Sequence, residues 1–417
     1  MLNTSRSKET AVLIGVHTRD SRVRAEESLS ELFQLALTAG AEVKAKFLQK
    51  RDHPHPAYYI GTGKVKSIRN YIHANSIDAV IVDGELRPTQ ERNLEKEFGV
   101  KVIDRVRLIL DIFAQRASTR VAKLQVELAQ MEYLLPRLQN IWTDFSRLGG
   151  GIGTRGPGEK KIEVDRRIIN DRITTIKKKL KGIKKKRESR ERNRKKSFKN
   201  LISLVGYTNS GKSTLMNTIT GSNVGVADKL FATLSTTTRK FRANKYRLLL
   251  SDTVGFIRKL PHKVIEAFMA TLEEAKDADL LYHVIDISAE NYRHRMKTVE
   301  KVLKDLDADN IPVIRVFNKI DLCDVNNTPR LEEGDPPSVF ISAQEERGID
   351  LLKKETEKQL DKNNTTVCLK IPQTRQDIVN YLYKTAHVSD REYRDNNVIL
   401  KASMDEEFVK TYQKYIV

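Results

Sequence analysis

Cysteine is scarce in this chain, and long apolar runs are absent from it. Only two cysteines, Cys323 and Cys368, occur among the 417 residues. A secreted protein built on disulfides uses several cysteines at patterned spacing, so we interpret both as reduced residues. No apolar run approaches the roughly 18 residues of a membrane span, and the start MLNTSRSKETAVLIGV lacks a signal-peptide pattern. These absences favour a soluble, cytoplasmic protein over a secreted or membrane-spanning one.

Positive charge is what the chain has in excess. Lys and Arg number 75 against 55 Asp and Glu, which gives a net charge of +20. Such an excess favours polyanionic partners, nucleic acid first and acidic lipid second. The length allows roughly two to four domains of ordinary size, each with its own core. Nothing in the sequence demands more than a monomer.

The first part of the chain alternates apolar runs with helical patterns. Short apolar runs predict four buried strands at residues 11–16, 41–48, 78–83 and 100–104. Between them, residues 28–37 and 64–73 have apolar side chains at three- and four-residue spacing, as amphipathic helices do. This alternation predicts an N-terminal α/β domain over residues 1–115. GTGK at residues 61–64 is too short for a phosphate-binding loop, and we interpret it as a turn between strand and helix.

Two segments with coiled-coil spacing follow. The apolar seams are Leu124, Leu128, Met131, Leu135 and Leu138 in the first, and Ile169, Ile173, Ile176, Leu180 and Ile183 in the second. The connector at residues 146–159 has six glycines and a proline, so neither helix can continue through it. We predict a helical hairpin with a Gly-rich tip over residues 116–199, and we expect Pro136 to kink or end the first helix near its last turn.

The end of the second segment is strongly basic. Residues 177–199 contain fourteen Lys or Arg and two Glu, a local net charge of +12. A solvated, partly disordered linker is one interpretation of such a run. A helix that continues as a basic arm facing RNA is the other.

The remainder of the chain contains a second α/β pattern and a short tail. Buried strands are predicted at residues 200–206, 248–255, 280–286, 313–319 and 339–343, mostly separated by helical patterns. A mainly parallel sheet with helices on both faces is therefore expected over residues 200–362. The tail, residues 363–417, has two strand-like runs at 367–372 and 397–404 and two helix-like runs, which predict a small C-terminal α/β domain.

One motif predicts a phosphate-binding loop. The segment GYTNSGKS matches GxxxxGKS, follows a predicted strand and precedes a helix-like run, which is the context this motif needs. Glycines let backbone N–H groups turn toward phosphates, and the helix N-terminus adds positive potential. We expect Lys212 to contact the β and γ phosphates and the Ser213 hydroxyl to bind Mg²⁺. The expected loop comprises Gly206, Tyr207, Thr208, Asn209, Ser210, Gly211, Lys212 and Ser213.

The motif DTVG follows at the end of another predicted strand. Asp252 can hold the Mg²⁺ hydration shell, and the Gly255 amide can face the γ phosphate. The next residue, Phe256, stands where many GTPases have a Gln that orients the attacking water. A phenyl ring has neither donor nor acceptor, so we predict slow hydrolysis by the isolated protein and stimulation by a partner. The four expected contact residues are Asp252, Thr253, Val254 and Gly255.

The motif NKID, also at the end of a strand, predicts guanine specificity. A carboxylate at Asp321 accepts from the guanine N1–H and exocyclic amine, and adenine offers no such donor pair on that edge. Ser342 and Ala343 lie where the last base-contacting loop should be. The expected ligands are therefore GTP and GDP, bound also through Asn318, Lys319, Ile320 and Asp321.

A threonine-rich segment, FATLSTTTR at residues 231–239, lies between the phosphate loop and DTVG. A switch loop must place one Thr hydroxyl on Mg²⁺ and its amide on the γ phosphate. Spacing alone does not choose among Thr233, Thr236, Thr237 and Thr238. An edge β-strand is the alternative interpretation of this cluster.

With these motifs in place, the chain resembles the HflX family of translation-associated GTPases, within the Obg-related branch. The resemblance covers nearly the whole chain. Its most specific matches are YYIGTGKV (58–65), VIDRVRLILDIFAQRA (102–117), KLQVELAQMEYLLPRL (123–138), SRLGGGIGTRGPGE (146–159) and DRRIINDRI (165–173). An aromatic residue in a DTVGF string is also typical of this family.

The resemblance implies particular roles for the switch residues. It places the Mg²⁺-binding threonine in FAT, which is Thr233 here, so Ser213 and Thr233 are the expected metal ligands. Lys212, Thr233 and Gly255 are the expected catalytic residues. Ser235 and Thr236 stand where the family usually has Asp-Pro. The nucleotide contacts expected in this segment are Phe231, Ala232, Thr233, Leu234 and Ser235.

The family likeness further implies a ribosomal partner. Members bind the large ribosomal subunit and are thought to split stalled or idle ribosomes under stress, with the Gly-rich tip of the hairpin near the peptidyl-transferase rRNA. A ribosome-assembly or RNA-binding factor that splits nothing is the alternative. A membrane-surface signalling GTPase is disfavoured, because no lipidation signal or amphipathic anchor accompanies the basic run. The expected rRNA contacts are Arg147, Gly149, Gly150, Gly151, Arg155, Lys160 and Lys161.

Overall fold

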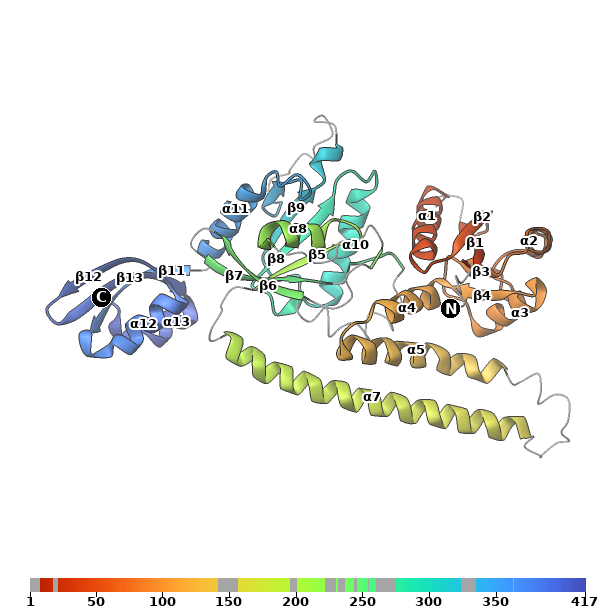
Figure 1. Ribbon diagram of the computed structural model, residues 1–417, viewed down its shortest axis with the longest axis horizontal. Coiled ribbons are helices and arrows are strands. Elements are labelled where there is room, and N and C mark those ends of the chain that lie inside the picture. The colour runs from red at the N-terminus through yellow and green to blue at the C-terminus, as the bar shows by residue number, and fades with distance from the viewer. Residues whose placement is uncertain are drawn as a thin grey trace, which may run out of the picture. The chain divides into compact units, whose positions relative to one another are not determined.

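The computed structural model of the chain consists of two compact units (Figure 1). The first comprises residues 1–183, 228–235 and 257–270, and the second comprises residues 184–227, 236–256 and 271–417. The structure describes residues 8–17, 22–141, 157–195, 201–221, 230–231, 237–243, 246–253, 255–259, 275–323, 335–362 and 364–417.

A four-stranded parallel sheet with helices on both faces begins the first unit. Its strands are β1 (Thr10–His17), β2 (Glu42–Lys50), β3 (Ala79–Val82) and β4 (Lys101–Asp104), in the spatial order β2-β1-β3-β4. Its helices are α1 (Arg22–Thr38), α2 (Thr62–Asn75), α3 (Pro88–Phe98) and α4 (Arg105–Arg116). Alternate residues of β1 face opposite sides, so Val12 and Ile14 join the core that includes Ile68 and Phe98. The predicted α/β fold of this part is confirmed.

Local sequence sets where the helices of this sheet begin and end. Pro88 opens α3, where its missing N–H has no intrahelical partner to lose. Gly99 ends the same helix at φ 69°, a left-handed conformation that favours glycine. At the start of α4, the Asp104 carboxylate accepts from the Arg107 backbone N–H at 2.8 Å.

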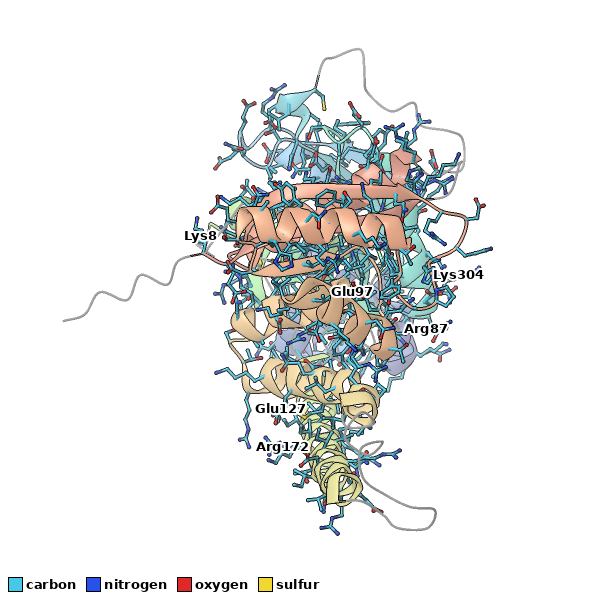
Figure 2. The ribbon with its side chains drawn as sticks, turned by 90° about the vertical axis from the view of Figure 1, so that its right-hand side faces the viewer. Lys8, Arg87, Glu97, Glu127, Arg172 and Lys304 are labelled. Atoms are coloured by element: carbon cyan, nitrogen blue, oxygen red, sulfur yellow. The ribbon has the colours of Figure 1, made fainter. Side chains whose placement is uncertain are left out.

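Two long helices, the second of which continues into the second unit after Ile183, form the predicted hairpin seam. They are α5 (Arg120–Ile141) and α7 (Pro157–Lys195). Leu124 and Leu128 of α5 pack with Ile173 and Ile176 of α7, and Met131, Leu135, Ile169, Leu180 and Ile183 lie against them. Figure 2 labels Glu127 and Arg172, whose side chains form an ion pair between the two helices.

Two expectations about these helices meet different outcomes. Helix α5 does not end at Pro136 but continues to Ile141, because a proline removes only one backbone donor; a kink at Pro136, the other expected outcome, stays a prediction. Helix α7 continues through the basic run as far as Lys195, so a helix is confirmed for these residues; that this helix faces RNA stays a prediction.

A six-stranded, mainly parallel sheet forms the nucleotide-binding part of the second unit. Its strands are β5 (Leu201–Gly206), β6 (Thr237–Ala243), β7 (Tyr246–Asp252), β8 (Leu280–Asp286), β9 (Val313–Asn318) and β10 (Ser338–Phe340). Its helices are α8 (Lys212–Thr220), α10 (Tyr292–Asp305), α11 (Ile349–Lys362) and the short 3₁₀ helix η2 (Ile320–Leu322). The order is β10-β9-β8-β5-β7-β6, with only β6 antiparallel, as the predicted fold class requires. Thr237 and Thr238 begin β6, so the edge-strand interpretation holds for these two threonines.

The C-terminal part of the second unit has its own sheet and core. Its elements are β11 (Asn364–Pro372), η4 (Gln373–Arg375), α12 (Gln376–Thr385), β12 (His387–Arg394), β13 (Asn397–Asp405), α13 (Glu406–Thr411) and η5 (Gln413–Tyr415). The antiparallel order is β11-β13-β12. Strand β12 was not among the two predicted strands, because its sequence HVSDREYR lacks an apolar alternation.

Within the part of the chain that the structure describes, none of the helices combines the length and the apolarity needed to cross a membrane.

Candidate nucleotide-binding site

The GYTNSGKS loop connects the end of β5 to the start of α8, and two of its glycines are required by close contacts. A Cβ on Gly206 would lie 2.3 Å from the Val284 carbonyl oxygen. Gly211 has φ +92°, and a Cβ there would lie 2.2 Å from Asn318 Nδ2. The loop therefore turns tightly enough for its backbone N–H groups and the N-terminus of α8 to face a phosphate.

Lys212 is held over this loop by backbone oxygens. Its Nζ donates to the Gly206 and Tyr207 carbonyls at 3.1 and 2.8 Å, and the residue is 7% exposed. Burial lowers the pKa of Lys212 to about 8, while the nearby Asp252 carboxylate acts in the opposite direction. An ammonium that donates to neutral carbonyls can exchange them for phosphate oxygens, which carry full negative charge.

Two hard oxygen ligands lie side by side at the start of α8. The Ser213 hydroxyl donates to Asp252 Oδ2 at 2.7 Å, and Asp252 is completely buried at the end of β7. Hydroxyl and carboxylate oxygens are ligands that Mg²⁺ prefers in proteins. This donor set therefore fits a magnesium ion bound next to the phosphate loop.

The DTVGF segment pairs with the phosphate loop through its backbone. Thr208 N–H donates to the Phe256 carbonyl at 2.8 Å, and Phe256 N–H donates to the Gly206 carbonyl at 3.1 Å. Gly255 lies so close that a Cβ on it would be 2.9 Å from Thr208 Cα and 3.1 Å from Lys212 Nζ. Gly255 is thus placed beside the ammonium expected to contact the β and γ phosphates, and a larger residue there would clash.

Thr253 of the same motif does not face the loop opening. Its hydroxyl donates to the Leu204 carbonyl at 2.5 Å, and the residue is fully buried. Its side chain thus ties β7 to β5 and stabilises the position of the motif.

Asn318 connects the base-recognition motif to the phosphate loop. Its Nδ2 donates to the Ser210 carbonyl at 2.9 Å, and its Oδ1 accepts from the Ala343 N–H at 2.9 Å. Lys319 adopts φ +69° and pairs with Asp286 at 2.8 Å. NKID, the Ser342–Ala343 loop and GYTNSGKS are therefore parts of one hydrogen-bonded site.

Asp321 lies in η2 with its side chain partly exposed. Among the described residues, no hydrogen bond or ion pair engages its carboxylate. Ser342 turns inward instead, where its hydroxyl accepts from the Glu345 N–H at 3.1 Å. A carboxylate with open acceptor positions next to Asn318 can receive the two donors of a guanine edge.

Several predicted site residues are elsewhere or not described. Phe231 belongs to the first unit, where its ring packs edge-on against Phe113 at a centroid distance of 4.6 Å. The predicted contacts Ala232, Thr233, Leu234, Ser235 and Val254 lie outside the described residues, as do Arg147, Gly149, Gly150, Gly151 and Arg155. Lys160 and Lys161 are in α7, but the structure does not describe their side chains.

The residues just after DTVGF have partners that the sequence did not indicate. Arg258 and Lys259 belong to the first unit, where Arg258 pairs with Glu27 at 2.8 Å and Lys259 pairs with Asp83 at 2.7 Å. Asp83 follows β3 and also pairs with the buried Arg105 at 2.9 Å. The sequence offered one signal for this cluster: Asp83 is the carboxylate at the end of the predicted strand 78–83, where parallel sheets commonly place functional groups.

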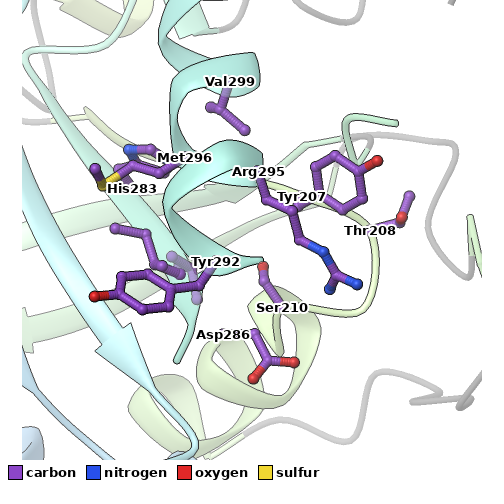
Figure 3. A pocket seen from close by; sticks show the side chains of 11 residues that line it. Tyr207, Thr208, Ser210, His283, Asp286, Tyr292, Arg295, Met296 and Val299 are labelled. Atoms are coloured by element: carbon purple, nitrogen blue, oxygen red, sulfur yellow. The ribbon is translucent and has the colours of Figure 1, made fainter. Parts of the chain in front are cut away.

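A small pocket adjoins the phosphate loop on the side of α10 (Figure 3). Arg295 of α10 lies over the Tyr207 ring at 5.2 Å and helps to hold that residue of the loop. His283 at the back of the pocket is 2% exposed, and burial, together with Arg315 and Lys212, lowers its pKa to about 3. His283 therefore remains a neutral part of the wall at ordinary pH.

Comparisons with known proteins match the chain in three successive segments. Residues 26–114 match a family described as GTP-binding GTPase N-terminal, and residues 116–194 match one described as GTP-binding GTPase Middle Region. Residues 201–319 match a family described as 50S ribosome-binding GTPase.

Curated relatives cover nearly the whole chain. GTPase HflX of Caldanaerobacter subterraneus subsp. tengcongensis is 44% identical over 418 residues, which is 100% of this chain and 96% of that protein. GTPase HflX of Escherichia coli (strain K12) is 45% identical over 82% of this chain and 80% of its own length. A solved GTP-binding protein of Sulfolobus solfataricus in complex with GDP is 25% identical, covers 84% of this chain and 98% of its own, and gives a TM-score of 0.45. The curated likeness extends well beyond the nucleotide site.

Proposed function

Because this chain belongs to the HflX family of GTPases, we propose that it binds the large ribosomal subunit in the cytoplasm and splits stalled or idle ribosomes. The chain binds guanine nucleotides and hydrolyses GTP to GDP and phosphate. The observation that carries the ribosomal partner is the match of residues 201–319 to a family described as 50S ribosome-binding GTPase.

The described side chains define the nucleotide part of this mechanism. Lys212 exchanges its carbonyl partners for the β and γ phosphates, and Asp321 accepts from the guanine edge. Ser213 would hold Mg²⁺ through its hydroxyl, and Asp252, which accepts from that hydroxyl, would hold the hydration shell of the ion. Bound Mg²⁺ neutralises the charge that develops on the phosphates. Thr233 remains the predicted second direct metal ligand.

Stimulation by the ribosome follows from the residue after DTVG. Phe256 is 2% exposed, and its side chain offers no donor or acceptor to an attacking water. Its backbone N–H and carbonyl are both bonded to the phosphate loop. The isolated chain therefore hydrolyses GTP slowly, and binding to the large subunit supplies or orders the missing group.

The helical hairpin provides the surface for RNA. The part of α7 that packs on α5 also carries exposed cations, among them Arg166, Arg167, Lys178, Lys179 and Lys181. A basic face beside a packed seam fits a phosphate backbone. The Gly-rich tip, with Arg147 and Arg155, is the predicted wedge into rRNA.

Sedimentation of intact ribosomes with the protein and a nonhydrolysable GTP analogue tests this function. We expect the ribosome peak to convert to separate subunits, with the protein on the large one. An assembly or RNA-binding factor would bind without converting the peak, and that result would refute splitting.

A charge reversal tests the predicted wedge in the same assay. Arg147→Glu with Arg155→Glu should weaken subunit binding and leave GTP affinity unchanged. Lys301→Glu with Lys304→Glu on α10 changes the charge by the same amount and serves as the matched control. If the tip variant splits ribosomes as well as the control, the hairpin is not the wedge.

A further inference from the structure

Three side chains form a distinct exposed patch on the C-terminal part of the chain. The Arg391 guanidinium of β12 lies 4.4 Å from the Tyr393 ring and 5.9 Å from the Tyr383 ring of α12. Tyr393 is 54% exposed and Tyr383 is 47% exposed. We call these three residues the Tyr–Arg–Tyr patch.

The strand register places the patch on the side of the sheet that α12 covers. Arg391 is opposite Leu400, and Tyr393 is opposite Val398, on the neighbouring strand β13. Both partners are fully buried in the core against Leu382 of α12. Because residues directly opposite each other share a face, the patch continues this core outward past the edge of the sheet.

Ion pairing does not explain why Arg391 is part of this patch. Among the described residues, Arg391 has no ion pair, whereas Arg394 of the same strand pairs with Glu392 at 3.2 Å. The core beneath the patch is closed by buried aliphatic side chains and does not need exposed rings. An arginine flanked by two tyrosines without an acidic partner is a composition typical of binding hot spots.

We propose that the Tyr–Arg–Tyr patch docks a carboxylate of an acidic protein segment on the large ribosomal subunit, and this rests on the function proposed above. A guanidinium presents a planar fork of donors that a carboxylate can accept in two parallel hydrogen bonds. The two rings supply flat apolar walls for the neighbouring residues of the same segment. The protein would thus attach to the large subunit at two places, through the hairpin and through the Tyr–Arg–Tyr patch.

Local charge favours a protein over RNA at this patch. Residues 364–417 contain eight Lys or Arg against seven Asp or Glu, a net charge of +1 out of +20 for the chain. An RNA backbone has a negative charge on every phosphate and needs an excess of cations to bind it. One unpaired guanidinium suits a single carboxylate, and the basic helix α7 suits RNA.

Photo-crosslinking on the full-length protein tests this proposal. The crosslinking amino acid p-benzoylphenylalanine replaces Tyr393, so that an aromatic ring stays in place, and the protein is bound to purified large subunits with a nonhydrolysable GTP analogue. We expect crosslinks to a ribosomal protein, at a peptide rich in Asp or Glu. Arg391→Glu should reduce them by about tenfold, consistent with the loss of a hot-spot residue.

A matched control separates charge from position. Lys401→Glu makes the same change in charge at an exposed residue of β13 that neighbours Leu400 and therefore points to the opposite face. It should leave the crosslink intact. Arg391→Gln removes the charge without adding a carboxylate and serves if Arg391→Glu disturbs folding.

Each other outcome is decisive. Crosslinks to rRNA, or a crosslink that survives both Arg391 variants, would overturn the proposal while subunit binding persists. If the wild-type protein does not sediment with large subunits at all, the proposed function fails and the patch loses its partner with it.

Discussion

The N-terminal sheet and the nucleotide-binding sheet differ at the edge where the carboxyl ends of their parallel strands lie. In the N-terminal sheet, the ends of β3 and β4 carry Asp83 and Asp104, and each pairs with an arginine, Arg105 at 2.9 Å and Arg137 at 3.1 Å. In the nucleotide-binding sheet, the end of β5 leads into a loop where, among the described residues, the hydrogen-bond acceptors of Lys212 are two backbone carbonyls. Both edges have the topology that commonly forms ligand sites.

The difference lies in how each edge satisfies its charges. Arg105 and Arg137 are 1% and 8% exposed, and the protein's own guanidiniums already neutralise the N-terminal carboxylates. Removing one partner of such a buried pair costs about 3–5 kcal/mol. Within the described part of the chain, Lys212 donates to carbonyl oxygens and to no carboxylate, so phosphate can take over these contacts. Topology therefore offers a site, and the partners of the buried charges decide whether a ligand enters.

We expect the largest change in GDP affinity from a substitution at Lys212. Lys212→Ala should weaken GDP binding by about 1,000-fold, because a buried charge-assisted contact with phosphate contributes several kcal/mol. Displacement of a fluorescent GDP analogue measures this. Lys301→Ala, on the exposed side of α10, is the control. A loss smaller than about tenfold would place the phosphates elsewhere.

Asp321 should control which base is bound. Asp321→Asn replaces an acceptor by a group that also donates, so the preference for GTP over ATP should fall by about 100-fold. Competition binding with GTP, ATP and xanthosine triphosphate measures this preference. The xanthine nucleotide should gain affinity, because its extra carbonyl accepts a hydrogen bond from the new Asn side-chain amide. Asp309→Asn is the exposed control. An unchanged GTP preference would remove Asp321 from the base site.

The N-terminal edge should respond in stability and not in nucleotide affinity. Arg105→Met leaves the buried Asp83 and the half-buried Glu31 without their shared guanidinium and should destabilise the first unit by about 3–5 kcal/mol. Hydrogen exchange of β3 and β4 amides reports this. Arg22→Met breaks an exposed pair with Glu26 and should cost at most about 0.5 kcal/mol. Equal effects of the two changes would contradict the contrast drawn here.

The smallest expected effect is a pH dependence that comes from His283. Burial lowers its folded pKa to about 3, so between pH 6.5 and 3 the unfolded chain binds a proton that the folded chain does not. Stability therefore falls as pH decreases, by about 2 kcal/mol between pH 7 and pH 5. Denaturant unfolding at both values, compared with His283→Leu, measures this. If His283→Leu loses as much stability between pH 7 and pH 5 as the wild type, the pH dependence comes from other groups.

The nucleotide-binding loop could be predicted because its chemistry demands fixed residues at fixed spacing. Asp252 and Asn318 each end a strand and Lys212 begins the helix after one, each within a short motif, and the structure joins these motifs through hydrogen bonds. Fold class was equally accessible, since strand and helix periodicities are local.

The charged edge of the N-terminal sheet was not predictable in this way. Arg105 lies in an apolar run, and its partners Glu31 and Asp83 come from distant parts of the chain. No spacing connects these residues, and pairing appears only once the sheet is formed. Strand β12 was missed for a related reason, because an exposed edge strand with alternating charges carries no apolar signal.

Titration calorimetry of the full chain with GDP decides whether the Lys212 loop is the nucleotide site. We expect one GDP bound per chain through this loop, with the same affinity in the wild type and in Arg105→Met. Absence of any heat of binding in clean wild-type protein would contradict this expectation, and so would a nucleotide affinity that disappears together with the N-terminal ion pairs.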